Sequence, residues 1–111
     1  MAGALRELRE ETGFGGADLE ALFDLDQVNQ FHEPSVDAIL VAAIFAVRIR
    51  SGVEPVISHE HDGLQWVTPE AALGIVVWPA YRESIRRIQE DLLDPDRATW
   101  FQLNLDGSRP G

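Results

Sequence analysis

The feature that most constrains the fold is an uninterrupted run of ten apolar residues at positions 38–47. A run of this length is too short to cross a membrane as a helix, which needs about 20 apolar residues. It is rich in Val and Ile and does not alternate with polar residues, which is typical of a β-strand covered on both faces. From Val47 to Arg50 apolar and basic residues alternate, so the strand is expected to reach solvent there. The run therefore predicts a sheet between two layers of structure.

Other local patterns predict the neighbouring elements. The expected strands are residues 26–32, 53–57 and 64–67, with Pro55 favouring an edge or irregular position for the second. Thr68 followed by Pro69 predicts the start of a short helix ending near residue 73. A second helix is expected from Pro79 to about residue 93, where Asp94-Pro95 ends it. In the tail, residues 95–111, the apolar part can dock or add a strand, and the last six residues are expected to be disordered.

The first residues predict a helix with one strongly acidic face. Residues 2–11 are mostly good helix formers, and Gly13 stands where a left-handed C-terminal cap is expected. Glu7, Glu10 and Glu11 are spaced i, i+3, i+4 and share a face. Three like charges one turn apart repel each other, and a hard cation such as Mg²⁺ removes that penalty. Arg6 lies one turn before Glu10 and can pair with it. Taken alone, this spacing is more often a solvated surface than a metal site.

The whole N-terminal string is more specific than its carboxylates. It resembles the second half of the Nudix motif, G-x5-E-x7-R-E-U-x-E-E-x-G-U, where U is apolar. The matching residues are Arg6, Glu7, Leu8, Glu10, Glu11, Gly13 and Phe14. The Gly and Glu of the first half would fall before Met1. The resemblance therefore implies an α+β fold, a Nudix-like α/β/α sandwich with a mixed sheet that lacks its N-terminal strands. Residues 1–94 would be a partial Nudix domain.

A second polar cluster, His59-Glu60-His61-Asp62, precedes the sequence Trp66-Val67-Thr68-Pro69. By itself it reads as a polar loop or a weak metal-binding tract. Together with Trp78-Pro79-x-x-Arg82, it is similar to the Nudix branch that acts on dATP and dihydroneopterin triphosphate. That resemblance gives Glu60 the role of an additional metal ligand or of the base for the attacking water. It leaves His59 and His61 structural or close to substrate, and Asp62 capping the turn.

The resemblance also implies a reaction. Water would attack a phosphorus atom of a nucleoside diphosphate linked to another moiety, with Mg²⁺ or Mn²⁺ neutralising the phosphate oxygens. Glu10 and Glu11 would be the main ligands, and Glu7 a further ligand or a base. Arg6 would orient Glu10. Because half of the motif and the neighbouring strands are missing, weak or no turnover is expected. With an uncovered strand edge, the chain is expected to form a homodimer, swap segments, aggregate or fold only partly.

Composition argues against several kinds of site and of binding partner. The chain of 111 residues has no cysteine, so disulfides, thiolate zinc sites and cysteine nucleophiles are excluded. The net charge of −10 argues against nucleic acid and anionic membranes as partners. With no apparent targeting segment, a cytoplasmic location is expected. Two alternatives to an enzyme stay open. One is a catalytically inactive Nudix-like module that binds a nucleotide or a protein, and the other is a small α+β domain with a merely solvated acidic helix.

Overall fold

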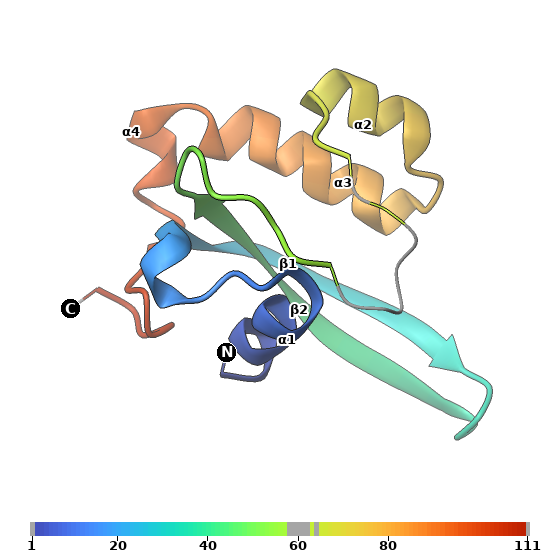
Figure 1. Ribbon diagram of the computed structural model, residues 1–111. Helices are drawn as coiled ribbons and strands as arrows, with labels where there is room; N and C mark the ends of the chain where they lie inside the picture. Colours follow the sequence, from blue (N-terminus) through green and yellow to red (C-terminus); the bar gives the residue numbers. More distant parts are fainter. Residues whose placement is uncertain (1, 58–62, 64, 111) are drawn as a thin grey trace.

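The computed structural model describes residues 2–57, 63 and 65–110. The elements in chain order are α1 (Ala2–Thr12), the 3₁₀ turn η1 (Gly16–Asp18), β1 (Leu19–Glu33), β2 (Ala38–Ile49), α2 (Pro69–Ile75), α3 (Pro79–Arg87), the π-helical turn η2 (Ile88–Leu92), α4 (Pro95–Ala98) and β3 (Gln102–Leu103). The long hairpin of β1 and β2 crosses the molecule, with α1 near one face and α2 and α3 near the other (Figure 1). The fold is α+β, as the sequence predicts.

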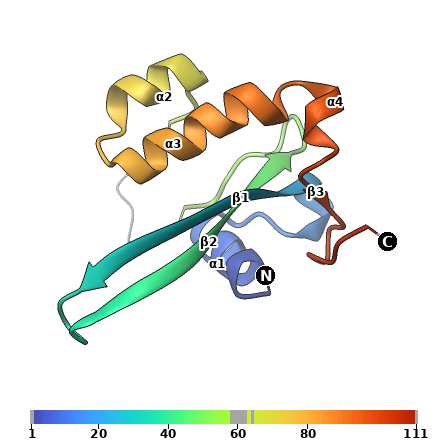
Figure 2. The ribbon, with the colours of Figure 1, turned by 180° about the vertical axis from the view of Figure 1, so that it is seen from behind.

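The sheet has the strand order β2-β1-β3, and β1 runs antiparallel to both neighbours. The expected mixed sheet is therefore not found in the described part of the chain. The view from behind shows β3 beside the start of β1 (Figure 2). The pairing of β3 with Leu22 and Phe23 means that the apolar tail adds a strand, which was one of two expected outcomes.

The two faces of the sheet bury different side chains. Alternate residues of β1 (Ala21, Phe23 and Leu25) pack with Leu92 and Ala98 on the side of α3. On the opposite face, Leu5 and Leu8 of α1 lie over Leu22, Phe45 and Val47. The predicted layering on both faces is therefore present where α1 and α3 overlap the sheet.

The predicted burial of the whole run 38–47 is wrong at its first half. Ile39 is 61% exposed and Val41 is 66% exposed, because the hairpin extends beyond both covering helices. The expected strand at 26–32 is longer, since β1 begins at Leu19. Residues 53–57 and 65–67 form no strand, and residue 64 lies outside the described residues. Pro55 has no N–H for a ladder, and the first of these segments instead contacts α1.

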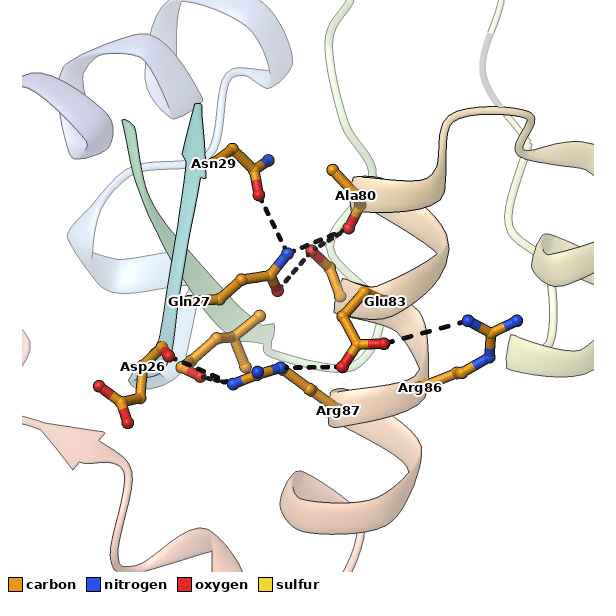
Figure 3. A network of polar contacts seen from close by, with 9 residues as sticks. Asp26, Gln27, Asn29, Ala80, Glu83, Arg86 and Arg87 are labelled. Carbon is orange, nitrogen blue, oxygen red and sulfur yellow. Dashed lines mark hydrogen bonds and ion pairs between the residues drawn. The ribbon is translucent and has the colours of Figure 1, made fainter. Parts of the chain in front are cut away.

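A bulge interrupts β1 between Asp24 and Gln27, where the pairing register with β2 shifts. Asp26 has a positive φ of 52° there. The guanidinium of Arg87 donates to the carbonyl oxygens of Leu25 (3.0 Å) and Asp26 (3.2 Å), so α3 supports the backbone that the bulge turns out of the ladder (Figure 3). Arg87 therefore contacts β1 at the bulge, where the strand continues on both sides of the register shift.

Helices α2 and α3 begin at the predicted residues, and α2 ends at Ile75, two residues beyond the predicted end. The hydroxyl of Thr68 accepts from the N–H of Ala71 at 3.2 Å at the start of α2, and Pro79 opens α3. The π-helical turn η2 continues α3 as far as Leu92, close to the predicted end. Near the C-terminus, the N–H of Asn104 donates to the carbonyl of Ser108 at 2.9 Å, which closes a turn.

That turn is centred on Asp106. The hydroxyl of Ser108 donates to the Asp106 carboxylate at 2.6 Å and its N–H donates at 2.8 Å, and these two bonds lower the pKa of Asp106. Because the carboxyl is the acceptor, its contribution to the turn is present above the unfolded-state pKa. It is lost as the pH falls through the lowered folded-state value.

Candidate functional site

The acidic face of α1 forms as predicted. Glu7, Glu10 and Glu11 are exposed, whereas Leu5 and Leu8 are half-buried against the sheet. Burial of the leucines fixes the rotation of the helix and therefore the direction in which the three glutamates point. The sequence spacing thus becomes a solvent-facing row of carboxylates on a helix held by its apolar side.

Arg6 pairs with one of these carboxylates. Its Nε lies 3.9 Å from Oε1 of Glu10, and both side chains are 64% exposed. An ion pair this exposed contributes little stability. As the i, i+4 spacing predicts, the pair brings Arg6 beside Glu10 on the face that also carries Glu7 and Glu11.

The end of α1 is defined by three contacts. Gly13 has a φ of 78°, and its N–H donates to the carbonyl of Arg9 at 2.9 Å, so the predicted left-handed cap is confirmed. Thr12 donates through its hydroxyl to the carbonyl of Leu8 at 2.6 Å. The carbonyl of Thr12 accepts from the N–H of Val56 at 2.7 Å, which joins the end of the acidic helix to the segment after β2.

The donor set on α1 suits a divalent cation in kind. Carboxylate oxygens are the ligands that Mg²⁺ and Mn²⁺ prefer, and such sites are completed by water and substrate phosphates. Within residues 2–57, 63 and 65–110, however, no group of three His, Asp or Glu side chains converges closely enough to hold a metal ion. The glutamates therefore need rotamer changes, or ligands from elsewhere, to bind one together.

The predicted fourth ligand, Glu60, and its neighbours His59, His61 and Asp62 lie outside the described residues. The segment before them is described. Gly13 and Val56 are in close contact there, because a Cβ on Gly13 would lie 3.2 Å from the Cβ of Val56. The chain that leads to Glu60 therefore passes the C-terminal end of the acidic helix.

Arg82, which belongs to the second resemblance, lies within the helical layer. Its guanidinium donates to the carbonyl of Leu73 and, at 3.2 Å, to the carbonyl of Val76. These bonds join the end of α2 to α3. In this structure Arg82 therefore holds the two helices together.

A polar network joins β1 to α3 (Figure 3). Gln27 is 8% exposed, and its amide nitrogen donates to Oδ1 of Asn29 and to the carbonyl of Ala80, each at 3.1 Å. Its amide oxygen accepts from the hydroxyl of Ser84 at 2.9 Å. The sequence gives no signal for this network, because the partners on α3 are more than 50 positions from Gln27 and the residue types are common on surfaces.

A hollow of about 480 Å³ lies on the α3 side of the sheet beside Phe23, Arg48, Trp66 and Ile88. The acidic face of α1 is on the other side. Both arginines beside the hollow make polar contacts with other groups of the chain. Nε of Arg48 lies 3.3 Å from Glu20, and Nε of Arg50 donates to the carbonyl of Ala17 at 3.2 Å. Arg48 is thus paired with a carboxylate, whereas Arg50 keeps its positive charge beside the hollow, because a carbonyl oxygen does not neutralise a guanidinium.

Comparison with known proteins identifies a family for this chain and no individual relative. None of the helices in the described part of the chain has the length and apolar content to span a membrane. No curated protein and no solved structure matches the chain. A family model, the NUDIX domain, matches residues 1–88, which include α1, the hairpin and α3. NUDIX domains hydrolyse compounds in which a nucleoside diphosphate is linked to another moiety, and they generally use divalent ions such as Mg²⁺ or Mn²⁺. With most of its length matched, this chain belongs to the NUDIX family.

Proposed function

We propose that the chain is a metal-dependent pyrophosphohydrolase of the nucleoside triphosphate type, with α1 as its catalytic element. The observation that carries this proposal is the exposed row of Glu7, Glu10 and Glu11 on a helix whose opposite face is packed on the sheet. A packed helix presents its carboxylates in a fixed direction, which is what a metal and phosphate site requires.

The glutamates of α1 and Arg6 have different roles in the proposed site. Glu10 and Glu11 hold the divalent ion, and Glu7 is a further ligand or accepts a proton. Arg6, 3.9 Å from Glu10, orients that carboxylate. When bound, the ion supplies positive charge against the phosphate oxygens.

Glu60 completes the set as a ligand or as the base. Val56 lies four residues before it and donates to Thr12 at the end of α1. The proton of the attacking water passes to Glu60 or Glu7 as the P–O anhydride bond breaks. The products are a monophosphate and pyrophosphate.

The substrate class rests on the resemblance of residues 58–73 and 78–82 to enzymes that act on dATP and dihydroneopterin triphosphate. The negative charge of the chain supports a requirement for metal, because a phosphorylated substrate must approach a protein of net charge −10.

The first experiment measures Mn²⁺ binding to the chain by calorimetry, followed by pyrophosphate release from a panel of nucleoside triphosphates. We expect binding that is lost in the double variant Glu10→Gln, Glu11→Gln. The matched control is Glu54→Gln, Glu90→Gln, which removes the same charge from exposed positions off α1. Equal loss in both variants, or Mn²⁺ binding unaffected by either, would contradict the proposal.

A second candidate is a NUDIX module that binds a nucleotide or a protein partner without turnover. The dispersed arrangement of the three glutamates favours it, since no three ligands converge within the described ranges. Mn²⁺-dependent nucleotide binding with no pyrophosphate release from any substrate would select this candidate. Release that requires Glu10 and Glu11 would select the enzyme.

A further inference from the structure

The turn after β3 contains an aspartate followed directly by a glycine, Asp106-Gly107. Because glycine has no side chain, its backbone nitrogen can approach the carboxyl carbon of the preceding residue without steric hindrance. Asp106 is exposed, so water reaches its carboxyl group. This dipeptide therefore has the chemistry for isomerisation to isoaspartate, in which the main chain continues through the side-chain carboxyl group. Asp62-Gly63 is a second such dipeptide, and Asp62 lies outside the described residues.

The isomerisation needs no reactant besides water. The nitrogen of Gly107 forms a bond to Cγ of Asp106, and the carboxyl hydroxyl leaves with the amide proton as water, which closes a succinimide ring. Water then adds to one of the two carbonyl carbons of the ring. Cleavage of the new bond to Cγ restores aspartate, whereas cleavage between the nitrogen and the main-chain carbonyl carbon gives isoaspartate.

Three hydrogen bonds of the folded turn oppose the first of these steps. The hydroxyl and the N–H of Ser108 donate to the Asp106 carboxylate at 2.6 Å and 2.8 Å, which holds that side chain toward Ser108. The attacking nitrogen is also engaged, because the N–H of Gly107 donates to the carbonyl of Asn104 at 2.9 Å. The two bonds from Ser108 lower the pKa of Asp106, so the protonated carboxyl, from which the hydroxyl leaves, is scarcer. The turn thus protects a dipeptide that its own sequence makes reactive.

Isoaspartate does not fit the same turn. It adds one carbon to the main chain before Gly107 and moves the carboxylate away from the position in which Ser108 holds it. The N–H of Asn104 closes the turn by donating to the carbonyl of Ser108 at 2.9 Å. The turn follows β3 directly, and Leu103 of β3 is buried and pairs with Leu22 at the start of β1 (Figure 2). Opening of the turn therefore loosens the attachment of the tail to the sheet.

We propose that Asp106 is a modification site of this chain, where spontaneous isomerisation to isoaspartate is restrained by Ser108 and, once it has occurred, releases the tail from β1. Ser108 acts by holding the carboxylate, and it takes no part in the bond changes. The rate at which isoaspartate forms then reports how often the turn opens. This inference does not depend on hydrolase activity.

Peptide mapping by mass spectrometry, during incubation of the intact chain at neutral pH, tests the site. We expect isoaspartate at position 106 to form at least about fivefold faster in Ser108→Ala than in the parent, because a hydrogen-bond donor to the charged group is lost. The matched control is Ser35→Ala, which removes a hydroxyl bonded to Glu33 in another exposed turn and should leave the rate at 106 unchanged. Equal rates in Ser108→Ala and the parent, or no isoaspartate at 106 in any chain, would overturn the proposal.

The same incubation in urea separates the effect of the turn from that of the sequence. When the chain is unfolded, the parent and Ser108→Ala should isomerise at equal rates, and both should exceed the rate of the folded parent. A difference between the two chains that persists in urea would contradict protection by the turn. Because mapping reports each peptide separately, isoaspartate formed at position 62 does not enter the comparison.

Hydrogen exchange tests the release of the tail. The chain with isoaspartate at 106 is separated from the parent by ion exchange, and the amides of residues 102–105 should exchange faster in it, with no change at residues 44–47 of β2. Asp106→Glu is the control for ageing, because glutamate forms the corresponding ring far less readily, and its exchange should not change during incubation. Unchanged exchange at 102–105 in the isomerised chain would contradict the release.

Discussion

At the scale of single residues, Gly13 has the most demanding position. It ends the acidic helix at a φ of 78°, and a Cβ there would approach Val56 at 3.2 Å. Both constraints follow from one requirement, which is that the chain must turn sharply after Glu11 and pass close to the segment leading to Glu60.

Gly13→Ala should lower the free energy of unfolding by about 1–2 kcal/mol, because an L-residue is strained in the left-handed region. Chemical denaturation monitored by circular dichroism measures this change. Gly3→Ala is the control. Gly3 lies inside α1 with nothing within 4 Å of the added methyl, so this change should stabilise by about 0.5–1 kcal/mol. A Gly13 variant as stable as the parent would mean that the cap is not needed.

Ser84→Ala removes the hydroxyl that donates to the amide oxygen of Gln27. Because Gln27 is 8% exposed, an unsatisfied acceptor there costs about 1 kcal/mol of unfolding free energy. Ser35→Ala, at an exposed turn, should change it by less than about 0.5 kcal/mol. Thermal unfolding of the two variants gives the comparison, and equal midpoints would show that the network carries no net stability.

At the scale of elements, the bulge of β1 depends on α3. Arg87→Ala removes donors from the carbonyls of Leu25 and Asp26 and should cost about 1–2 kcal/mol of unfolding free energy. Its neighbour Arg86 forms an exposed ion pair with Glu83 at 4.0 Å, and its alanine variant should cost less than about 0.5 kcal/mol. Denaturant titrations of both variants measure the difference. A reversed order would show that the bulge holds without α3.

The elements also show how far the sequence predicts the fold. Helices α1, α2 and α3 are anticipated because caps, prolines and apolar stripes are local signals. The bulge at Asp26 is not, and the strand β3 is predicted only as one of two outcomes for the tail, because each depends on partners far along the chain. The strand predicted at 53–57 is wrong for the same reason, because the N–H of Val56 donates to the carbonyl of Thr12 and not to a neighbouring strand.

In the candidate site too, features set by local sequence are predicted, and features set by tertiary contacts are not. The acidic face and the Arg6–Glu10 pair follow from helical periodicity alone. The direction in which that face points depends on how Leu5 and Leu8 meet the sheet, which no local pattern encodes. The predicted roles of the glutamates stay predictions.

At the scale of the whole molecule, the net charge of −10 sets the electrostatic behaviour. Self-repulsion of the chain destabilises the compact state, and monovalent salt should raise the unfolding temperature by screening it. Divalent ions should raise the unfolding temperature further if α1 binds them. When the free ion is at 10 times its dissociation constant, binding raises the free energy of unfolding by about 1.4 kcal/mol.

The two increments can be separated by variants. The unfolding temperature is measured in NaCl and in MnCl₂ at equal ionic strength, for the parent and for Glu10→Gln, Glu11→Gln. We expect MnCl₂ to exceed NaCl for the parent and to equal it for the variant, because the variant keeps most of the net charge but loses the carboxylate pair. If MnCl₂ exceeds NaCl by the same amount in both, the ion binds elsewhere or acts on the overall charge, and the acidic face of α1 is only a solvated surface.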